Sequence, residues 1–187
     1  LPLLMVGCSD DWNRGECRVH LSFSEDFGLD YRISETKGGS SINLPDTNDF
    51  ILSIKDMDSG EELFRDVYSN RPSVINLAEG KYSIGVYSSE FDEPAFDIPV
   101  FGDEHTLYIE GADVDISFVC KQLNSGLRMV FDESFKEQFP SSKVVVKQEE
   151  HLLSYPYTED RIAFFSIGKV DMFLATGEKS SHLLTRV

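Results

Sequence analysis

Residues 77–87 read L-A-E-G-K-Y-S-I-G-V-Y, which is the clearest fold signal in the chain. Tyr82, Ile84 and Val86 alternate with small or polar residues, and this period of two is typical of a half-buried β-strand. Gly80 stands where a turn must end before the strand begins. The stretch predicts a turn that feeds Tyr82 into the core of a β-protein, although an ordinary hairpin would have the same local sequence.

The same period of two recurs on both sides of this stretch. Asp58-Ser59-Gly60 and Gly111-Ala112 supply turn residues, so each is predicted to join two strands as a hairpin. Short strands separated by frequent turn signals are typical of a β-sandwich or a barrel. The strands predicted in this part of the chain are 17–24, 50–55, 62–68, 73–77, 81–87, 105–110 and 113–120.

A second unit is predicted to begin near Lys121. Within residues 131–139 three phenylalanines stand four residues apart, Asp132 is a good N-cap and Pro140 a stop, so one short helix is predicted there. The remaining strands are expected at 127–131, 143–147, 152–155, 161–165, 169–174 and 181–187. The predicted fold class is all-β, with tandem β-sandwiches and one short helix in the second.

A weak internal sequence similarity supports the tandem arrangement. Residues 19–27, V-H-L-S-F-S-E-D-F, resemble residues 127–135, L-R-M-V-F-D-E-S-F. Two related units would show such self-similarity, although any amphipathic strand that enters an acidic turn looks similar. We expect three parts: 1–14 as signal remnant and tether, 15–121 as one sandwich, and 122–187 as a smaller one that rests on the first or continues past its end.

Residues 3–8, L-L-M-V-G-C, bear on location rather than on chemistry. A short apolar run that ends in a small residue resembles the end of a secretory signal. With Cys next, it resembles the lipobox of bacterial lipoproteins, where the signal is cleaved before the Cys and the thiol is acylated. We therefore expect lipidation of Cys8 and a surface-exposed lipoprotein of the bacterial outer membrane. The alternative is a hydrophobic N-terminus with a chance Gly-Cys pair.

The composition describes a folded, acidic body. Hydrophobic residues make up 41% and aromatic residues 12% of the chain, which is enough for a core. The net charge of −16 repels phosphate groups, so we exclude nucleic acid as a partner. The same charge opposes docking on anionic lipid, and contact with the membrane is expected through the lipid anchor alone.

Two cysteines remain if Cys8 carries lipid. Cys17 and Cys120 both point to the apolar side of their predicted strands. If these strands are antiparallel neighbours, a disulfide could close a loop of about 100 residues. Two buried free thiols, which behave as small apolar groups, are the alternative.

Two stretches, 25–48 and 88–103, lack the period of a strand and are predicted to be irregular. Phe91, Phe96 and Phe101 lie in the second stretch, which is acidic and contains prolines. These rings could stack on a sugar or on a partner chain, although a loop more often packs its own rings onto the core.

The sequence contains no motif with a catalytic mechanism behind it. There is no G-x-S-x-G elbow, P-loop or dinucleotide fingerprint, and the four histidines lack the spacing of a zinc site. An EF-hand loop that began at Asp56 would need Glu at its twelfth position, which is Val67. We therefore expect no enzyme, no cofactor and no metal.

Four stretches together resemble a known family. They are C-S-D-D at 8–11, the entry strand that ends S-F-S-E, I-N-L-A-E-G-K-Y-S-I-G-V-Y at 75–87, and V-C-K-Q-L-N-S-G-L-R-M-V-F at 119–131. The chain resembles a domain of unknown function in surface lipoproteins of gut Bacteroidales, related in architecture to fimbrillin-like cell adhesion proteins. The resemblance implies two transthyretin-like or immunoglobulin-like sandwiches behind a lipid anchor.

Three hypotheses for function follow. The first is an adhesion or pilus-associated module that contacts a protein partner by strand addition at an exposed edge. The second is a non-catalytic spacer or glycan-associated module of a carbohydrate-utilisation lipoprotein. The third is an enzyme, for which we find no motif.

Overall fold

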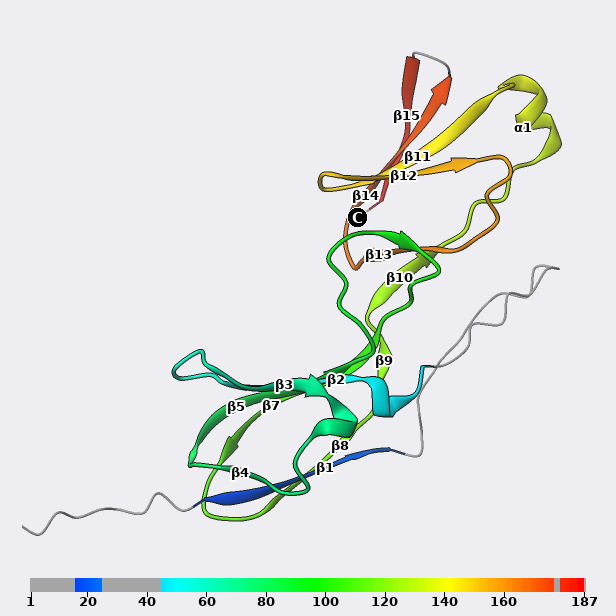
Figure 1. The fold of residues 1–187 in the computed structure, drawn as a ribbon. Coiled ribbons are helices and arrows are strands. Elements are labelled where there is room, and N and C mark those ends of the chain that lie inside the picture. The colour runs from blue at the N-terminus through cyan, green and yellow to red at the C-terminus, as the bar shows by residue number, and fades with distance from the viewer. Residues whose placement is uncertain (1–15, 25–44, 177–178, 187) are drawn as a thin grey trace, which may run out of the picture.

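The computed structural model describes residues 16–24, 45–176 and 179–186, the last of these as backbone only. Figure 1 shows two lobes, one above the other, with the short strand β9 near their junction. The first lobe is built from β1 to β5 and β7 to β9, and the second from β6 and β10 to β15. The chain is all-β, with two tandem transthyretin-like or immunoglobulin-like sandwiches and one short helix in the second. The predicted fold class is confirmed.

Two sheets form the first lobe. The three-stranded sheet has the order β4-β1-β8, and the five-stranded sheet has the order β3-β2-β5-β7-β9. Strand β1 pairs antiparallel with β4 and parallel with β8. The bounds are β1 Cys17–Phe23, β2 Ile51–Asp56, β3 Glu62–Val67, β4 Ile75–Leu77, β5 Gly80–Tyr87, β7 Phe101–Ile109, β8 Val114–Phe118 and β9 Lys121–Gln122.

Alternate residues of these strands fill the space between the two sheets. Leu52, Ile54, Ile84, Phe101 and Ile109 are all completely buried. Burial of one such side chain contributes about 1.5–3 kcal/mol relative to leaving it in water. This is why the period of two in the sequence identified the inward face correctly.

The turn before β5 is a corner between the two sheets rather than a hairpin. Strand β4 belongs to the three-stranded sheet and β5 to the five-stranded one. The Tyr82 ring is buried, and its hydroxyl donates a hydrogen bond to the carbonyl oxygen of Ala78 at 3.0 Å. A tyrosine that bonds back to the corner upstream of its strand is a known feature of immunoglobulin-type sandwiches. The predicted role of Tyr82 is confirmed.

The second lobe contains a four-stranded sheet, β12-β11-β14-β15, and a three-stranded sheet, β10-β13-β6. The predicted helix is present, and Asp132 caps it by accepting a hydrogen bond from the backbone N–H of Ser134 at 2.9 Å. The bounds are β6 Ala95–Phe96, β10 Asn124–Leu127, α1 Glu133–Gln138, β11 Ser142–Gln148, β12 His151–Pro156, β13 Ala163–Ser166, β14 Val170–Thr176 and β15 Lys179–Arg186.

The two lobes repeat one pattern of strand pairing. In the first lobe β1 pairs with β4, β2 with β3 and β5, and β5 with β7, all antiparallel. In the second lobe β10 pairs with β13, β11 with β12 and β14, and β14 with β15, again all antiparallel. The sequence similarity between residues 19–27 and 127–135 is therefore accompanied by a repeat of the strand pairing.

Three predictions about strands are wrong. The strands at 105–110 and 113–120 do not form a hairpin, because β7 pairs with β5 and β9 whereas β8 pairs with β1 in the other sheet. The strand predicted at 127–131 ends at Leu127. Strands β6 and β9 were missed, because two residues are too few to show a period.

The predicted irregular stretch at 25–48 lies mostly outside the described residues. Its described end forms a short 3-10 turn, η1 (Thr47–Asp49), and a second one, η2 (Tyr68–Asn70), follows β3. The domain boundary near Lys121 stays a prediction. One segment crosses it, because β6 belongs to the part of the chain assigned to the first unit and pairs with β13 in the second lobe.

Candidate binding groove

A hollow lies on the outer face of the five-stranded sheet and reaches to the second lobe. Its volume is about 950 Å³, within the range of small-molecule sites. We call it the sheet groove. The residues on which the argument depends are Ser53, Arg65, Ser83, Tyr87, Glu90, Phe91, Gly102, Glu104, Ser166 and Ile167.

The period of two in the strands creates the floor of the groove. Because Tyr82, Ile84 and Val86 point into the core, Ser83 and Tyr87 point outward. Gly102 of β7 lies opposite Tyr87. A Cβ atom at Gly102 would lie 2.4 Å from the carbonyl oxygen of Val86 and 2.9 Å from a methyl carbon of Leu123, so only glycine fits there.

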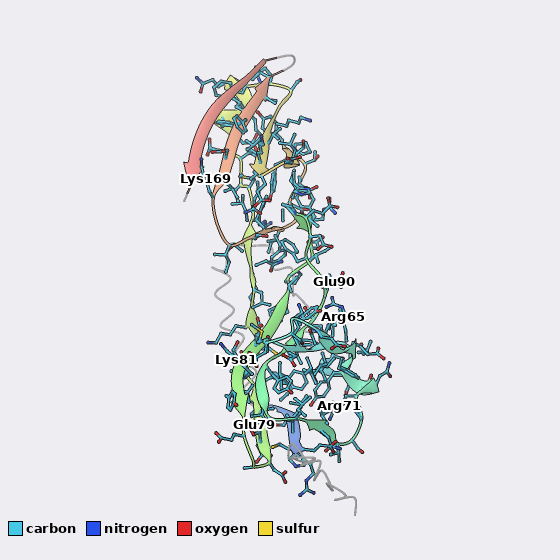
Figure 2. The ribbon with its side chains drawn as sticks, turned by 90° about the vertical axis from the view of Figure 1, so that its left-hand side faces the viewer. Arg65, Arg71, Glu79, Lys81, Glu90 and Lys169 are labelled. Atoms are coloured by element: carbon cyan, nitrogen blue, oxygen red, sulfur yellow. The ribbon has the colours of Figure 1, made fainter. Side chains whose placement is uncertain are left out.

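Arg65 organises one side of the groove. Its guanidinium donates to Glu62 Oε1 at 3.0 Å and also pairs with Glu90. The guanidinium carbon lies 5.5 Å from the centre of the Tyr87 ring, within cation–π range. Figure 2 shows Arg65 and Glu90 next to each other near the junction of the lobes. The side chain of Arg65 thus joins two strands and the segment that follows β5.

Hydroxyl groups complete this network. Ser53 Oγ donates to Glu62 Oε1 at 2.9 Å, and Ser83 Oγ donates to Glu104. The bond from Ser53, followed by the bond from Arg65, holds the pKa of Glu62 below its ordinary value. The bond to Glu90 is the main cause of the raised pKa of Arg65. The groove therefore presents a cation, held in place by Glu62 and Glu90, beside the ring of Tyr87.

The far wall of the groove comes from the second lobe and from the two segments, 98–100 and 121–124, that connect the lobes. We call these two segments the neck. Ser166, the last residue of β13, and Ile167, which follows it, line this wall, and the Ile167 side chain is exposed. Buried Asn124 fixes the neck, because its Oδ1 accepts from the N–H of Val100 at 3.0 Å and its Nδ2 donates to the carbonyl of Ile98 at 2.9 Å. These bonds tie the segment before β7 to the start of the second lobe.

The three phenylalanines predicted as possible ligand contacts have different environments. Phe101 is completely buried in the first core, which excludes the possible ligand contact and leaves the alternative, packing of the ring onto the core. Phe96 packs edge-on against Tyr155 at 5.2 Å, with the guanidinium of Arg161 4.5 Å from its ring centre. Only Phe91 of the three lines the groove, where it is half-buried.

Sequence reasoning missed Arg65, Tyr87 and Glu90 as site residues. Tyr87 was predicted to lie in a strand, and its position opposite to Tyr82 and Ile84 in the period of two marked it as outward-facing. Nothing in the sequence indicated that Arg65 would lie beside Glu90, because the two are 25 residues apart and belong to different elements.

The disulfide considered for Cys17 and Cys120 is absent, and both thiols are buried. It required antiparallel neighbouring strands, whereas β1 and β8 run parallel and Val19 lies opposite Val114. Cys17 precedes the start of this pairing and Cys120 follows its end, so the two lie roughly 20 Å or more apart along the sheet. A disulfide needs Cα atoms within about 7 Å. Burial raises the pKa of the Cys120 thiol to about 12.

Cys8 lies outside the described residues, so its lipidation stays a prediction. None of the helices in the described part of the chain has the length and apolar character that a membrane crossing needs. No group of three or more His, Cys, Asp or Glu side chains that could hold a metal occurs among the described residues. The Asp56 carboxylate accepts from the N–H groups of Asp58 and Ser59 at 2.8 and 3.0 Å, which closes the hairpin turn.

Comparison with known proteins gives a family and two distant structures. A family model described as domain of unknown function (DUF4493) matches residues 29–182, which confirms the resemblance seen in the sequence. No curated protein matches. A "putative adhesin" from Bacteroides ovatus ATCC 8483 is similar at 9% identity and a TM-score of 0.44, over 96% of this chain and 87% of that one. A second one from Bacteroides ovatus is similar at 9% identity and a TM-score of 0.41, over 96% of this chain and 78% of that one. Similarity at this level says nothing about what this chain binds.

Proposed function

The chain belongs to the DUF4493 family of domains of unknown function, and we propose that it is a non-catalytic binding module of the adhesion type. In this proposal it is held at the bacterial surface by a lipid on Cys8 and binds a polyhydroxylated ligand, such as a glycan, in the sheet groove. The observation that supports this most is the groove itself, in which charged and hydroxyl groups surround an accessible aromatic ring.

The chemistry of the groove suits a ligand with many hydroxyl groups. Each carboxylate has about four acceptor positions, so Glu90 and Glu104, which line the groove, can still accept bonds from a ligand while they hold Arg65 and Ser83. The faces of Tyr87 and Phe91 offer apolar surface of the kind on which a sugar ring can stack. An aromatic platform with a few placed polar groups is the usual composition of a small-molecule site.

Glu62 supports the groove from the side of Arg65. The bonds from Ser53 and Arg65 stabilise its ionised form and lower its pKa. The carboxylate is therefore suited to hold the Arg65 guanidinium beside the Tyr87 ring.

A glycan array tests the groove most directly. The wild-type protein should bind a subset of glycans, and Tyr87→Ala should reduce that binding by about tenfold or more, since loss of roughly 1.4 kcal/mol has this effect. Tyr108→Ala is the matched control, because Tyr108 is an exposed tyrosine at the distant end of the same sheet face. Equal binding by both variants, or no binding by the wild type, would remove the groove from the proposal.

The anchor needs a separate experiment. Metabolic labelling with palmitate should mark the wild-type protein and not Cys8→Ser, and protease treatment of intact cells should digest the protein at the surface. Recovery of unlabelled protein from the cytosol would contradict the proposed location while leaving the glycan result unaffected.

A further inference from the structure

The segment that joins β5 to β7 leaves the first lobe, reaches the second lobe and returns. In the middle of this segment, residues 88–101, β6 pairs with β13 of the second lobe. Figure 1 shows the segment in green, rising from the lower lobe to β13 of the upper one. Its ends are held together, because Ser88 N–H donates to the Phe101 carbonyl at 2.7 Å and Phe101 N–H donates to Ser88 Oγ at 3.0 Å. We call residues 88–101 the strap.

The tip of the strap belongs to the second sandwich. Phe96 lies opposite Ala163 of β13. Its half-buried ring packs against the second core and lies edge-on to Tyr155, with the ring centres 5.2 Å apart. The guanidinium carbon of Arg161 lies 4.5 Å from the centre of the same ring. Contacts with a second ring and with a cation add to the stabilisation that burial alone provides, so Phe96 anchors the strap on the second lobe.

The backbone just after β6 is held in an unusual conformation. Asp97 has a φ of +60°, in the left-handed region that residues other than glycine seldom adopt. Its N–H donates to the carbonyl of Ile162 at 2.8 Å. A residue in such a conformation keeps it only where the surrounding structure fixes it. The strap therefore turns back toward the first lobe at a point that the second lobe determines.

Both lobes hold the two limbs of the strap. In the outgoing limb, Glu90 pairs with Arg65 of β3 in the first lobe. Farther along the same limb, Glu93 Oε2 lies 3.4 Å from His151 Nδ1 of β12 in the second lobe. The returning limb is held at the neck by the side chain of Asn124. The strap is thus attached to each lobe by side chains as well as by the strand pairing of β6.

The outgoing limb also forms part of the sheet groove, which is lined by Ser89, Glu90, Phe91 and Asp92 of the strap. One wall of the groove is the sheet of the first lobe, and the far wall includes Ser166 and Ile167 of the second. Strand β13, with which β6 pairs, ends at Ser166. The strap therefore contacts the elements that form both walls, and its position on the second lobe sets the distance between them.

We propose that the strap fixes the second lobe to the first and thereby holds the two walls of the sheet groove at a set distance, with Phe96 as the positioning residue. Phe96 acts through Glu90 and Phe91, which precede it in the strap and line the groove. This deepens the proposed function, on which the part that concerns ligand binding rests. A ligand that contacts both walls stabilises the docked strap in turn, because a ligand favours the state that it binds.

Residual dipolar couplings of the full chain measure how the lobes are fixed without any ligand. For the wild type, one alignment tensor should fit the amides of both lobes. In Phe96→Ala the second lobe should lose this common alignment. The Asp97 amide should also exchange at least about tenfold faster, since its bond to Ile162 opens when the strap detaches. Phe96→Tyr keeps the ring contacts and should behave as the wild type does.

Phe135→Ala is the matched control for the loss of a phenylalanine. Phe135 is also half-buried against the second core, but it lies in α1 and contacts Phe131 and Phe139. Its truncation should lower the stability of the second lobe and leave the common tensor and the exchange of Asp97 unchanged. If Phe96→Ala unfolds the second lobe, Phe96→Leu keeps apolar volume without the ring contacts and should give a smaller change in the same direction.

The glycans that the wild type binds on the array test the effect on the groove. Phe96→Ala should raise their dissociation constant by about tenfold, which is 1.4 kcal/mol, and Phe135→Ala should leave it unchanged. A common tensor in both Phe96→Ala and Phe96→Leu, or equal weakening of binding by Phe135→Ala, would overturn the proposal. If the wild type binds no glycan, the proposed function fails, and the dipolar couplings alone decide whether the strap fixes the lobes.

Discussion

The two lobes share one order of strands but differ in how completely their cores are covered. The first core contains sixteen buried residues and five half-buried apolar ones that pack against it. In the second, six described residues are buried and nine apolar ones are only half-buried. Half-buried Leu127, Met129 and Phe131 lie along β10 and the segment after it, at the edge of the three-stranded sheet. Among the described residues, the two lobes thus share an order of strands but differ in the share of apolar side chains that are fully buried.

The largest expected effect comes from matched core truncations. Ile84 of β5 is fully buried, whereas Met172 lies half-buried in β14, which has the corresponding place in the second lobe. Ile84→Ala should lower the free energy of unfolding by about 2–5 kcal/mol. Met172→Ala should cost about half as much or less. Urea unfolding followed by NMR signals from each lobe measures both, and equal losses would contradict the difference between the cores.

The hydroxyl groups of two buried tyrosines, one in each lobe, allow a closer comparison of the lobes. Tyr68 donates to the carbonyl of Leu21 at 2.9 Å, and Tyr155 donates to the carbonyl of Leu127 at 3.0 Å. Each bond ties the first strand of a lobe to the opposite side of the sandwich. Tyr68→Phe and Tyr155→Phe should each cost about 1–2 kcal/mol, since an acceptor is left unsatisfied.

Exposed Tyr108 provides the control for these two substitutions. Tyr108→Phe should change the free energy of unfolding by less than about 0.5 kcal/mol, because its hydroxyl bonds to Glu79 at the surface. If Tyr155→Phe were as mild as this control, the two tyrosines would not have equivalent roles in the repeat.

Much of the fold could be predicted from local pattern. The period of two located the inward residues around Tyr82, and Asp132 marked the start of the helix. Strand partners could not be predicted, because the parallel pairing of β1 with β8 joins residues about 95 positions apart and leaves no local trace. The strand at 127–131 was predicted from its alternation, which is present, but a strand also requires a neighbour.

The groove was harder to predict than the core. Its polar residues are ordinary on the outer face of a sheet, and Arg65, Glu90 and Ser166 come together only because the lobes meet at the neck. The three phenylalanines were candidates for ligand contact because they are large aromatic residues in a predicted loop. Their large apolar surface also explains why Phe101 is buried.

A smaller effect is expected for an ion pair of the second lobe. The Arg161 guanidinium donates to both oxygens of Glu159, at 2.8 and 2.7 Å, and lowers the pKa of that carboxyl to about 2. The ionised form is favoured in the folded state. The contribution to stability is therefore fully present above about pH 4.5, the ordinary value for Glu, and is lost as the pH falls toward 2.

Glu159→Gln tests this contribution. The variant should be less stable than the wild type at pH 7 by less than about 1 kcal/mol, as is usual near a surface. The difference should shrink below pH 4.5 and vanish near pH 2, as thermal unfolding at a series of pH values would show. A difference independent of pH would mean that charge is not its cause.

The smallest expected effect is that of a reducing agent. Because Cys17 and Cys120 are not joined, dithiothreitol should leave the unfolding temperature unchanged. Iodoacetamide should react with Cys120 only after unfolding, since the thiol is buried and its pKa is raised to about 12. A drop in unfolding temperature on reduction would show that the two strands approach each other differently.

Hydrogen exchange at Ser22 and Val130 tests the central comparison most directly. These residues occupy corresponding positions in the two lobes, and only Ser22 has a strand beside it. We predict slow exchange of the Ser22 amide and fast exchange of the Val130 amide. Equally slow exchange at both residues would contradict the comparison, in which β1 lies between two strands and β10 lies at the edge of its sheet.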